Sequence, residues 1–201
     1  MTRKELTRNY WRYYRMIEDK FRETIDYVEI ATTNFFTYSN EFAMLLQSIG
    51  SELDNVFKVY CGFNPTERKN ITDYANFILN EYPAIVNDEI RIAGTDVKVV
   101  PFQGWTATAA AQSLPWWQAF VDIKHNRYGN FPEANQRNVL NTLAALYILE
   151  MKMFTKATKE KDPTQLSDWD IPDGDSKVFL YPKWKFRCID ISDPVFEELE
   201  V

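Results

Sequence analysis

The fold is decided by one stretch of the chain, VLNTLAALYIL at positions 139–149. This stretch is apolar on nearly every side of a helix, which is typical of a helix surrounded by other elements. The small side chains of Ala144 and Ala145 allow a neighbouring helix to approach closely. We therefore expect a mainly α-helical, single-domain bundle built around one central helix, which begins at Pro132 and runs to Phe154.

Four further segments repeat hydrophobic residues at intervals of three and four, which predicts amphipathic helices. Ser39 is a favourable N-cap, and Gly62 follows the last apolar position of the same segment. Asn64 followed by Pro65 has the pattern of another helix start. These helices are expected over residues 6–25, 39–61, 64–82 and 114–127.

The pattern changes to a period of two around residues 88–101, where Ile90 and Ile92 alternate with charged residues. This alternation predicts a small β-hairpin inserted in the bundle. We expect residues 1–160 to form the helical domain and residues 161–201 to form an extended acidic tail packed on it. Two segments of that tail, 177–181 and 184–189, have the composition of short strands.

The 201 residues carry a net charge of −6, but the charge is uneven along the chain. Residues 1–22 hold seven basic and three acidic residues, whereas residues 160–201 hold five basic and eleven acidic ones. The longest apolar run has seven residues, well below the roughly 20 that span a bilayer. We therefore expect a cytoplasmic protein with no membrane partner, no metal and no cofactor.

A dense polar cluster lies just before the central helix and contains the only histidine of the chain. Asp122 and His125 are three positions apart on a predicted helix, close enough for the carboxylate to orient the imidazole. With a cation to hold a phosphate, such a group suits metal-independent RNA cleavage. The alternative is structural, because basic side chains at a helix C-terminus complement its dipole. The cluster comprises Asp122, Lys124, His125, Asn126 and Arg127.

Asparagines at the start of the central helix form a second polar group. Amides on a helix that is otherwise apolar need hydrogen-bond partners, so Asn135 and Asn138 indicate either a polar pocket or a buried network. If the helices over 39–61 and 114–127 pack side by side, acidic residues of the first could meet Lys124 or Arg127, more often as structural ion pairs than as a site. These acidic residues are Glu41, Glu52 and Asp54.

Two basic segments have the composition of nucleic-acid contacts. Arg8, Arg12 and Arg15 form a stripe on the first predicted helix, and the sequence KWKFR at 183–187 alternates cations with aromatic rings. The stripe is also explained by a solvated helix face that meets the acidic tail. The second segment is also explained by an edge strand protected by charge.

Three sequences carry a resemblance to a known group of proteins: YSNE at 38–41, SELD at 51–54, and LPWW at 114–117 continuing to KHNR at 124–127. Together they resemble a family of uncharacterised, all-helical bacterial proteins over residues 25–155. That family is similar, at a distance, to the HEPN superfamily. The resemblance implies a helical bundle of the kind found in toxin–antitoxin and phage-defence systems, where many members are RNases that act as dimers.

The resemblance implies roles for the polar cluster. His125 would be the acid/base, Asp122 its orienting group, and Lys124 and Arg127 the phosphate contacts. Substrate contacts are also expected from Asn126, Asn135 and Asn138. Active HEPN nucleases place the arginine before the histidine, whereas Arg127 follows His125 here, so a member that only binds RNA is an open alternative.

Two other classes of function remain open at this level. One is a binding or regulatory module that recruits a protein partner through the basic helix or the tail. The other is a self-associating protein whose Trp116 and Trp117 contact a second copy in a homodimer. The expected ligands are RNA or a nucleotide.

Overall fold

The computed structural model describes residues 1–161 and 176–181, and most of the chain is helical. The α-helices are α1 (Arg3–Leu6), α2 (Arg12–Ile25), α3 (Asn40–Cys61), α4 (Ile71–Glu81), α5 (Pro115–Asn126) and α6 (Gln136–Lys161). A π-helical turn, η1 (Thr7–Trp11), joins α1 to α2. Short 3-10 turns lie at η2 (Thr32–Asn34), η3 (Pro83–Asn87), η4 (Ala107–Ala109) and η5 (Phe131–Glu133). The strands are β1 (Ile90–Ile92), β2 (Lys98–Val99) and β3 (Phe179–Leu180).

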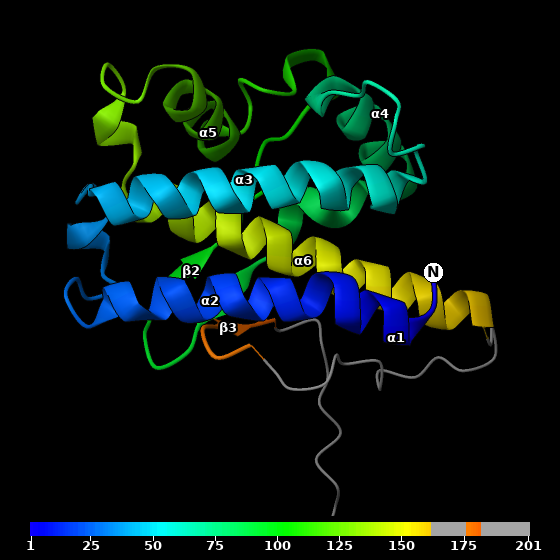
Figure 1. Ribbon diagram of the computed structural model, residues 1–201, viewed down its shortest axis with the longest axis horizontal. Coiled ribbons are helices and arrows are strands. Elements are labelled where there is room, and N and C mark those ends of the chain that lie inside the picture. Colours follow the sequence, from blue (N-terminus) through cyan, green and yellow to red (C-terminus); the bar gives the residue numbers. More distant parts are fainter. Residues whose placement is uncertain (162–175, 182–201) are drawn as a thin grey trace, which may run out of the picture.

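Helix α6 is the centre of the structure, as the apolar stretch at 139–149 predicts. All but one of the residues in that stretch are buried, and the exception, Asn141, is partly buried. Helices α2 and α3 run along α6, while α4 and α5 lie on the opposite side of α3 from α2 (Figure 1). The expected mainly helical architecture around a central apolar helix is therefore confirmed.

Helices α3 and α5 pack at close range because α3 has a glycine at the crossing. A Cβ atom added at Gly50 would lie 2.7 Å from Cε2 of Phe120 and closer still to other atoms of that ring. Trp116 and Trp117 are buried at the same interface, and the indole of Trp116 donates a hydrogen bond to the carbonyl of Pro101 at 2.6 Å. Since both indoles are buried within this chain, they do not provide the self-association surface expected from the sequence.

The predicted hairpin is confirmed, and a third strand extends it. Strand β1 pairs with β2 on one edge and with β3 on the other, antiparallel in both cases. Ile90 and Ile92 face the core, while Arg91 between them is exposed. An isolated two-stranded hairpin is marginal in water, so packing against the helices and addition of β3 both stabilise it.

Helix ends agree with the sequence in one case and differ in two. Helix α3 begins after Ser39, whose hydroxyl accepts a hydrogen bond from the amide of Phe42 at 3.0 Å, and it ends at Gly62 with φ of 69°. Helix α4 begins only at Ile71, because Asn70 forms a capping box with Asp73. The expected start at residue 64 is therefore wrong.

Helix α6 begins at Gln136, later than the expected start at Pro132. Pro132 lies in the short turn η5, and the side chain of Asn135 accepts a hydrogen bond from the amide of Asn138 at 3.0 Å. An asparagine in this position is a favourable N-cap, and it overrides the preference of proline for the first helical turn.

Several expectations lie outside the described residues, namely the strand at 184–189, the KWKFR segment at 183–187 and most of the acidic tail. The division into a domain of residues 1–160 and a tail also remains a prediction. Over residues 1–161 and 176–181, no helix combines the length and the apolar character that crossing a membrane requires.

Candidate functional site

The structure brings four residues of the predicted polar cluster together at the end of α5, and all four are exposed: Lys124, His125, Asn126 and Arg127. Asp122, one turn earlier, is partly buried. Its Oδ1 accepts a hydrogen bond from Gln118 Nε2 at 2.9 Å. No hydrogen bond joins Asp122 to His125 in the part of the chain that is described, so the expected orientation of the imidazole by Asp122 is not formed here.

The cluster's other polar side chains contact nearby structural groups. Arg127 donates from Nη1 to Asn40 Oδ1 at 3.1 Å, which ties the end of α5 to the start of α3. Asn126 accepts from the amide of Gly129 at 3.1 Å and so stabilises the turn after the helix. Lys124 Nζ lies 5.6 Å from the ring centroid of Phe120. These contacts have the geometry of a helix end fixed to its neighbours.

The asparagines of α6 form a buried network. Asn135 Nδ2 donates to the carbonyl of Pro132 at 2.9 Å, and Asn138 Nδ2 donates to the carbonyl of Glu133 at 2.9 Å. The first backbone amides of α6 have other acceptors: those of Gln136 and Arg137 donate to the carbonyls of Thr37 and Phe35, both at 3.0 Å, and that of Asn138 donates to the Asn135 cap. The side chains that the sequence offered as substrate contacts thus hold the η5–α6 junction.

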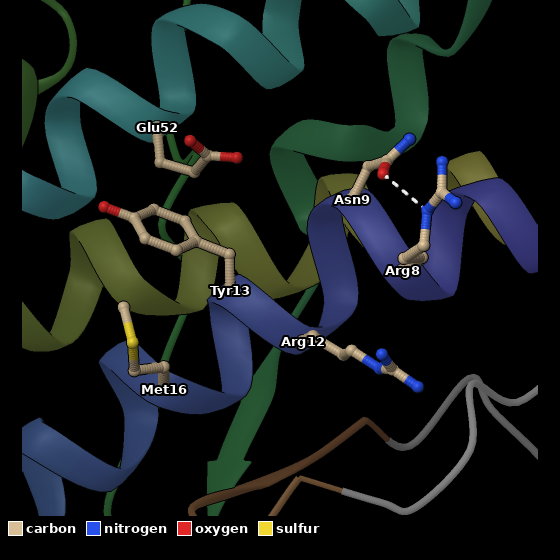
Figure 2. Close-up of a pocket in the computed structure, with 6 residues that line it drawn as sticks. All are labelled: Arg8, Asn9, Arg12, Tyr13, Met16 and Glu52. Carbon is tan, nitrogen blue, oxygen red and sulfur yellow. Dashed lines mark hydrogen bonds between the residues drawn. The ribbon is translucent and has the colours of Figure 1, made fainter.

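A different region of the molecule contains an open cleft of about 570 Å³. It lies between the N-terminal helices and α3, and Figure 2 shows Tyr13 and Asn9 on the side that faces Glu52. The guanidinium groups of Arg8 and Arg12 extend away from Tyr13 and Glu52 (Figure 2). The lining residues are Arg8, Asn9, Arg12, Tyr13, Met16 and Glu52.

Glu52, which lines this cleft, interacts electrostatically with a second buried carboxyl group, that of Glu150. Glu52 is 9% exposed, and burial raises its pKa above the ordinary value. Glu150, on α6, is fully buried, and both of its carboxyl oxygens lack a hydrogen-bond partner. Burial raises the pKa of Glu150 well above 4.5, and the negative charge of Glu52 raises it further. Both effects favour the protonated form of Glu150.

The π turn η1 adds a hydroxyl group to this pair. Burial, and then the charges of Glu52 and Glu150, raise the pKa of Tyr10. Trp11, the next residue, is buried and stacks on Tyr14 with ring centroids 4.8 Å apart. An inserted π turn re-aims side chains within a helix and is frequent at functional sites. Here it presents Tyr10 to the two carboxyl groups while Trp11 stays in the core.

Glu52 does not have the role that the sequence suggested. Glu52 faces α2 and not the end of α5, and its described hydrogen bond is a long one, 3.4 Å, from Nδ2 of Asn55 on its own helix. Glu150 was not predicted at all. The sequence nevertheless contains a sign of this buried acid, because Glu150 directly follows the apolar stretch. It lies four positions beyond Leu146, so both side chains are on the same buried face of the helix.

Two other buried polar groups have structural roles. Asp88 accepts hydrogen bonds from the hydroxyl groups of Tyr82 at 3.0 Å and Tyr181 at 2.6 Å. Burial raises the pKa of the Cys61 thiol to about 12, so this cysteine is an unreactive core residue. Within residues 1–161 and 176–181, no group of three or more His, Cys, Asp or Glu side chains has an arrangement that could hold a metal ion.

Comparison with known proteins adds no relative. No protein-family model, no curated protein and no solved structure matches this chain. The resemblance to HEPN proteins consequently stays a prediction, and the functional argument depends on the cleft and on the end of α5.

Proposed function

We propose that the protein binds single-stranded RNA along the exposed face of α1, η1 and α2, with the cleft as the place where a base enters. The observation that carries this proposal is the position of Tyr13 on the wall of a cleft that Arg8 and Arg12 also line. Proteins that bind single strands combine cations that follow the backbone with rings on which bases stack.

The side chains of this face are available to a ligand. Neither Arg8 nor Arg12 forms an ion pair within the described residues, and Arg8 only donates to its neighbour Asn9 at 3.2 Å. Tyr13 is 39% exposed and Met16 is 55% exposed. Two guanidinium groups that lack an acidic partner attract phosphate, and guanidinium forms bidentate hydrogen bonds with it.

The local positive charge favours binding of RNA to this face over the rest of the surface. The chain as a whole is acidic at −6, but residues 1–22 are net +4. Binding of a polyanion to such a restricted basic face is strongly salt-dependent, because each neutralised phosphate releases a counterion. The competing occupant is the acidic segment 160–201 of the same chain, which is net −6.

The first prediction concerns Arg12→Ala in the full chain. We expect a short uridine-rich RNA to bind the natural protein with a Kd in the micromolar range at low salt, and the variant to bind about three- to tenfold more weakly. The slope of log Kd against log salt should fall by about 0.7, the value for one phosphate contact on a single strand. Fluorescence anisotropy at several salt concentrations measures both quantities.

Arg22→Ala is the matched control, since Arg22 lies on the same helix and is paired with Asp19 at 3.4 Å. It should leave Kd and salt slope unchanged. If RNA does not bind at low salt, while Arg12→Ala lowers the free energy of unfolding there, the basic face contacts the acidic segment and the RNA proposal is wrong.

The second prediction separates binding from cleavage. His125 is exposed and is not oriented by Asp122, so we expect RNA incubated with a chelator to stay intact with both the natural protein and His125→Ala. Gel electrophoresis of a labelled mixed-sequence RNA is the measurement. Chelator-resistant cleavage that disappears in His125→Ala would instead establish the nuclease that the HEPN resemblance implies.

A further inference from the structure

Among the described residues, Glu52 is the one acidic residue that lines the cleft, and it faces Tyr13 across it (Figure 2). A carboxylate accepts about four hydrogen bonds, whereas Glu52 receives one long bond at 3.4 Å. Most of its accepting capacity is therefore open to a ligand that enters beside Tyr13. A ligand that satisfies it must present N–H or O–H donors.

Glu150 determines how much negative charge lies at this position. Burial and the charge of Glu52 both raise the pKa of Glu150 and so favour its neutral form, which limits the negative charge of the pair. A single carboxylate in a partly desolvated site is well suited to bind a neutral ligand group that carries two adjacent hydrogen-bond donors. A cation would instead be repelled by Arg8 and Arg12, which lie on the same cleft.

Among the RNA bases, one has an edge of this kind. The Watson–Crick edge of guanine presents two neighbouring donors, N1–H and N2–H, which a carboxylate accepts together. Adenine presents one donor and one acceptor, cytosine presents one donor and two acceptors, and uracil presents a single donor between two acceptors. Unpaired bases are commonly recognised through this edge while they stack on an aromatic ring.

Building on the proposed RNA-binding function, we propose that the cleft is a guanine-selective site. In this arrangement the base stacks on Tyr13, the Glu52 carboxylate accepts N1–H and N2–H, and Arg8 and Arg12 contact the flanking phosphates. Glu150, the buried carboxyl group that interacts with Glu52, is a positioning residue. The site selects one base, whereas the basic face alone would bind any single strand.

The test uses uridine-rich oligomers that differ at one central position, which is guanine, adenine, cytosine or uracil. With the full chain, the guanine oligomer should bind about tenfold more tightly than the other three, as expected for one bidentate contact. Glu52→Gln should reduce this preference to about twofold or less, because an amide offers one acceptor and a donor that opposes N1–H. Glu41→Gln, an exposed position on the same helix, should retain it.

The outcomes distinguish the two proposals. Equal binding of all four oligomers, or a guanine preference that survives in Glu52→Gln, overturns guanine selection but leaves RNA binding in place. If no oligomer binds, both proposals are wrong. Circular dichroism of Glu52→Gln checks the fold, and Tyr13→Ala, a change on the surface, tests the same site by removing the stacking ring and should lower affinity for every oligomer.

Discussion

Glu18→Ala should lower the free energy of unfolding by about 3–5 kcal/mol, the largest effect that we expect from a single polar substitution here. Glu18 is fully buried on α2 and accepts hydrogen bonds from the Tyr14 hydroxyl at 2.8 Å and from the Ser176 hydroxyl. It also accepts from the backbone amides of Lys177 at 3.1 Å and Val178 at 3.3 Å. Alanine would remove the acceptor that these donors share, and Tyr14 and Val178 among them are buried.

The loss should be concentrated at the edge of the sheet. Strand β3 has two residues, so its attachment depends on Glu18 as well as on pairing with β1. We expect hydrogen exchange of residues 176–181 to increase sharply in Glu18→Ala, and urea denaturation to give the change in stability. Glu18→Gln, which keeps one acceptor oxygen, should fall between the two proteins.

Glu23→Ala is the control on the same helix, because Glu23 is 63% exposed and pairs only with Lys20 at 2.9 Å. Exposed pairs of this kind contribute little, so its effect should stay within about 0.5 kcal/mol. A Glu18→Ala protein that matches the natural one in both stability and exchange would show that the bonds to residues 176–178 do not hold the segment.

The bonds from Glu18 to residues 176–178 also illustrate which parts of the fold can be predicted from the sequence. The apolar stretch at 139–149 predicts the central helix, and Ser39 with Gly62 predicts both ends of α3, because these signals are local. The contact between Glu18 and Ser176 joins positions far apart in the chain. No local pattern encodes such a contact, so the strand at 177–181 was predicted but its pairing with β1 was not.

The candidate site was less predictable than the fold for the same reason. The cluster around His125 is conspicuous in the sequence, yet Gln118 lies one turn before Asp122 and takes its hydrogen bond. Glu52 and Glu150 lie on different helices and become neighbours only through the packing of α3 on α6. Their relation is a property of tertiary structure, whereas the basic stripe containing Arg8 and Arg12 was visible as a helical period.

Glu150→Leu should stabilise the protein at pH 7, by about 1–3 kcal/mol. A buried acid with no hydrogen-bond partner on either oxygen is unfavourable, and leucine of similar size removes the polar group without opening a cavity. Thermal or urea denaturation measures the change. Leu149→Ala, at the neighbouring buried position, is the opposite control and should lose about 2–5 kcal/mol through cavity formation.

The dependence on pH gives an independent signature of the same group. Below its ordinary pKa of 4.5, Glu150 is protonated in both the folded and the unfolded chain. Above that pH the unfolded chain releases the proton and the folded protein retains it, so the free energy of unfolding falls as pH rises, until the raised folded pKa is reached. The slope from this group is at most about 1.4 kcal/mol per pH unit. Glu150→Leu and Glu150→Gln should both remove it.

The two substitutions then separate a structural role from a functional one. Glu150→Gln is expected to keep the unfavourable buried polar group while losing the proton, whereas Glu150→Leu loses both. If Glu150→Leu is more stable at pH 7 yet loses the guanine preference, the acid is retained at the expense of stability because it positions Glu52. If Glu150→Leu is less stable than the natural protein at every pH, the carboxyl group of Glu150 supports the fold. Glu52 would then bind guanine in the cleft without help from Glu150.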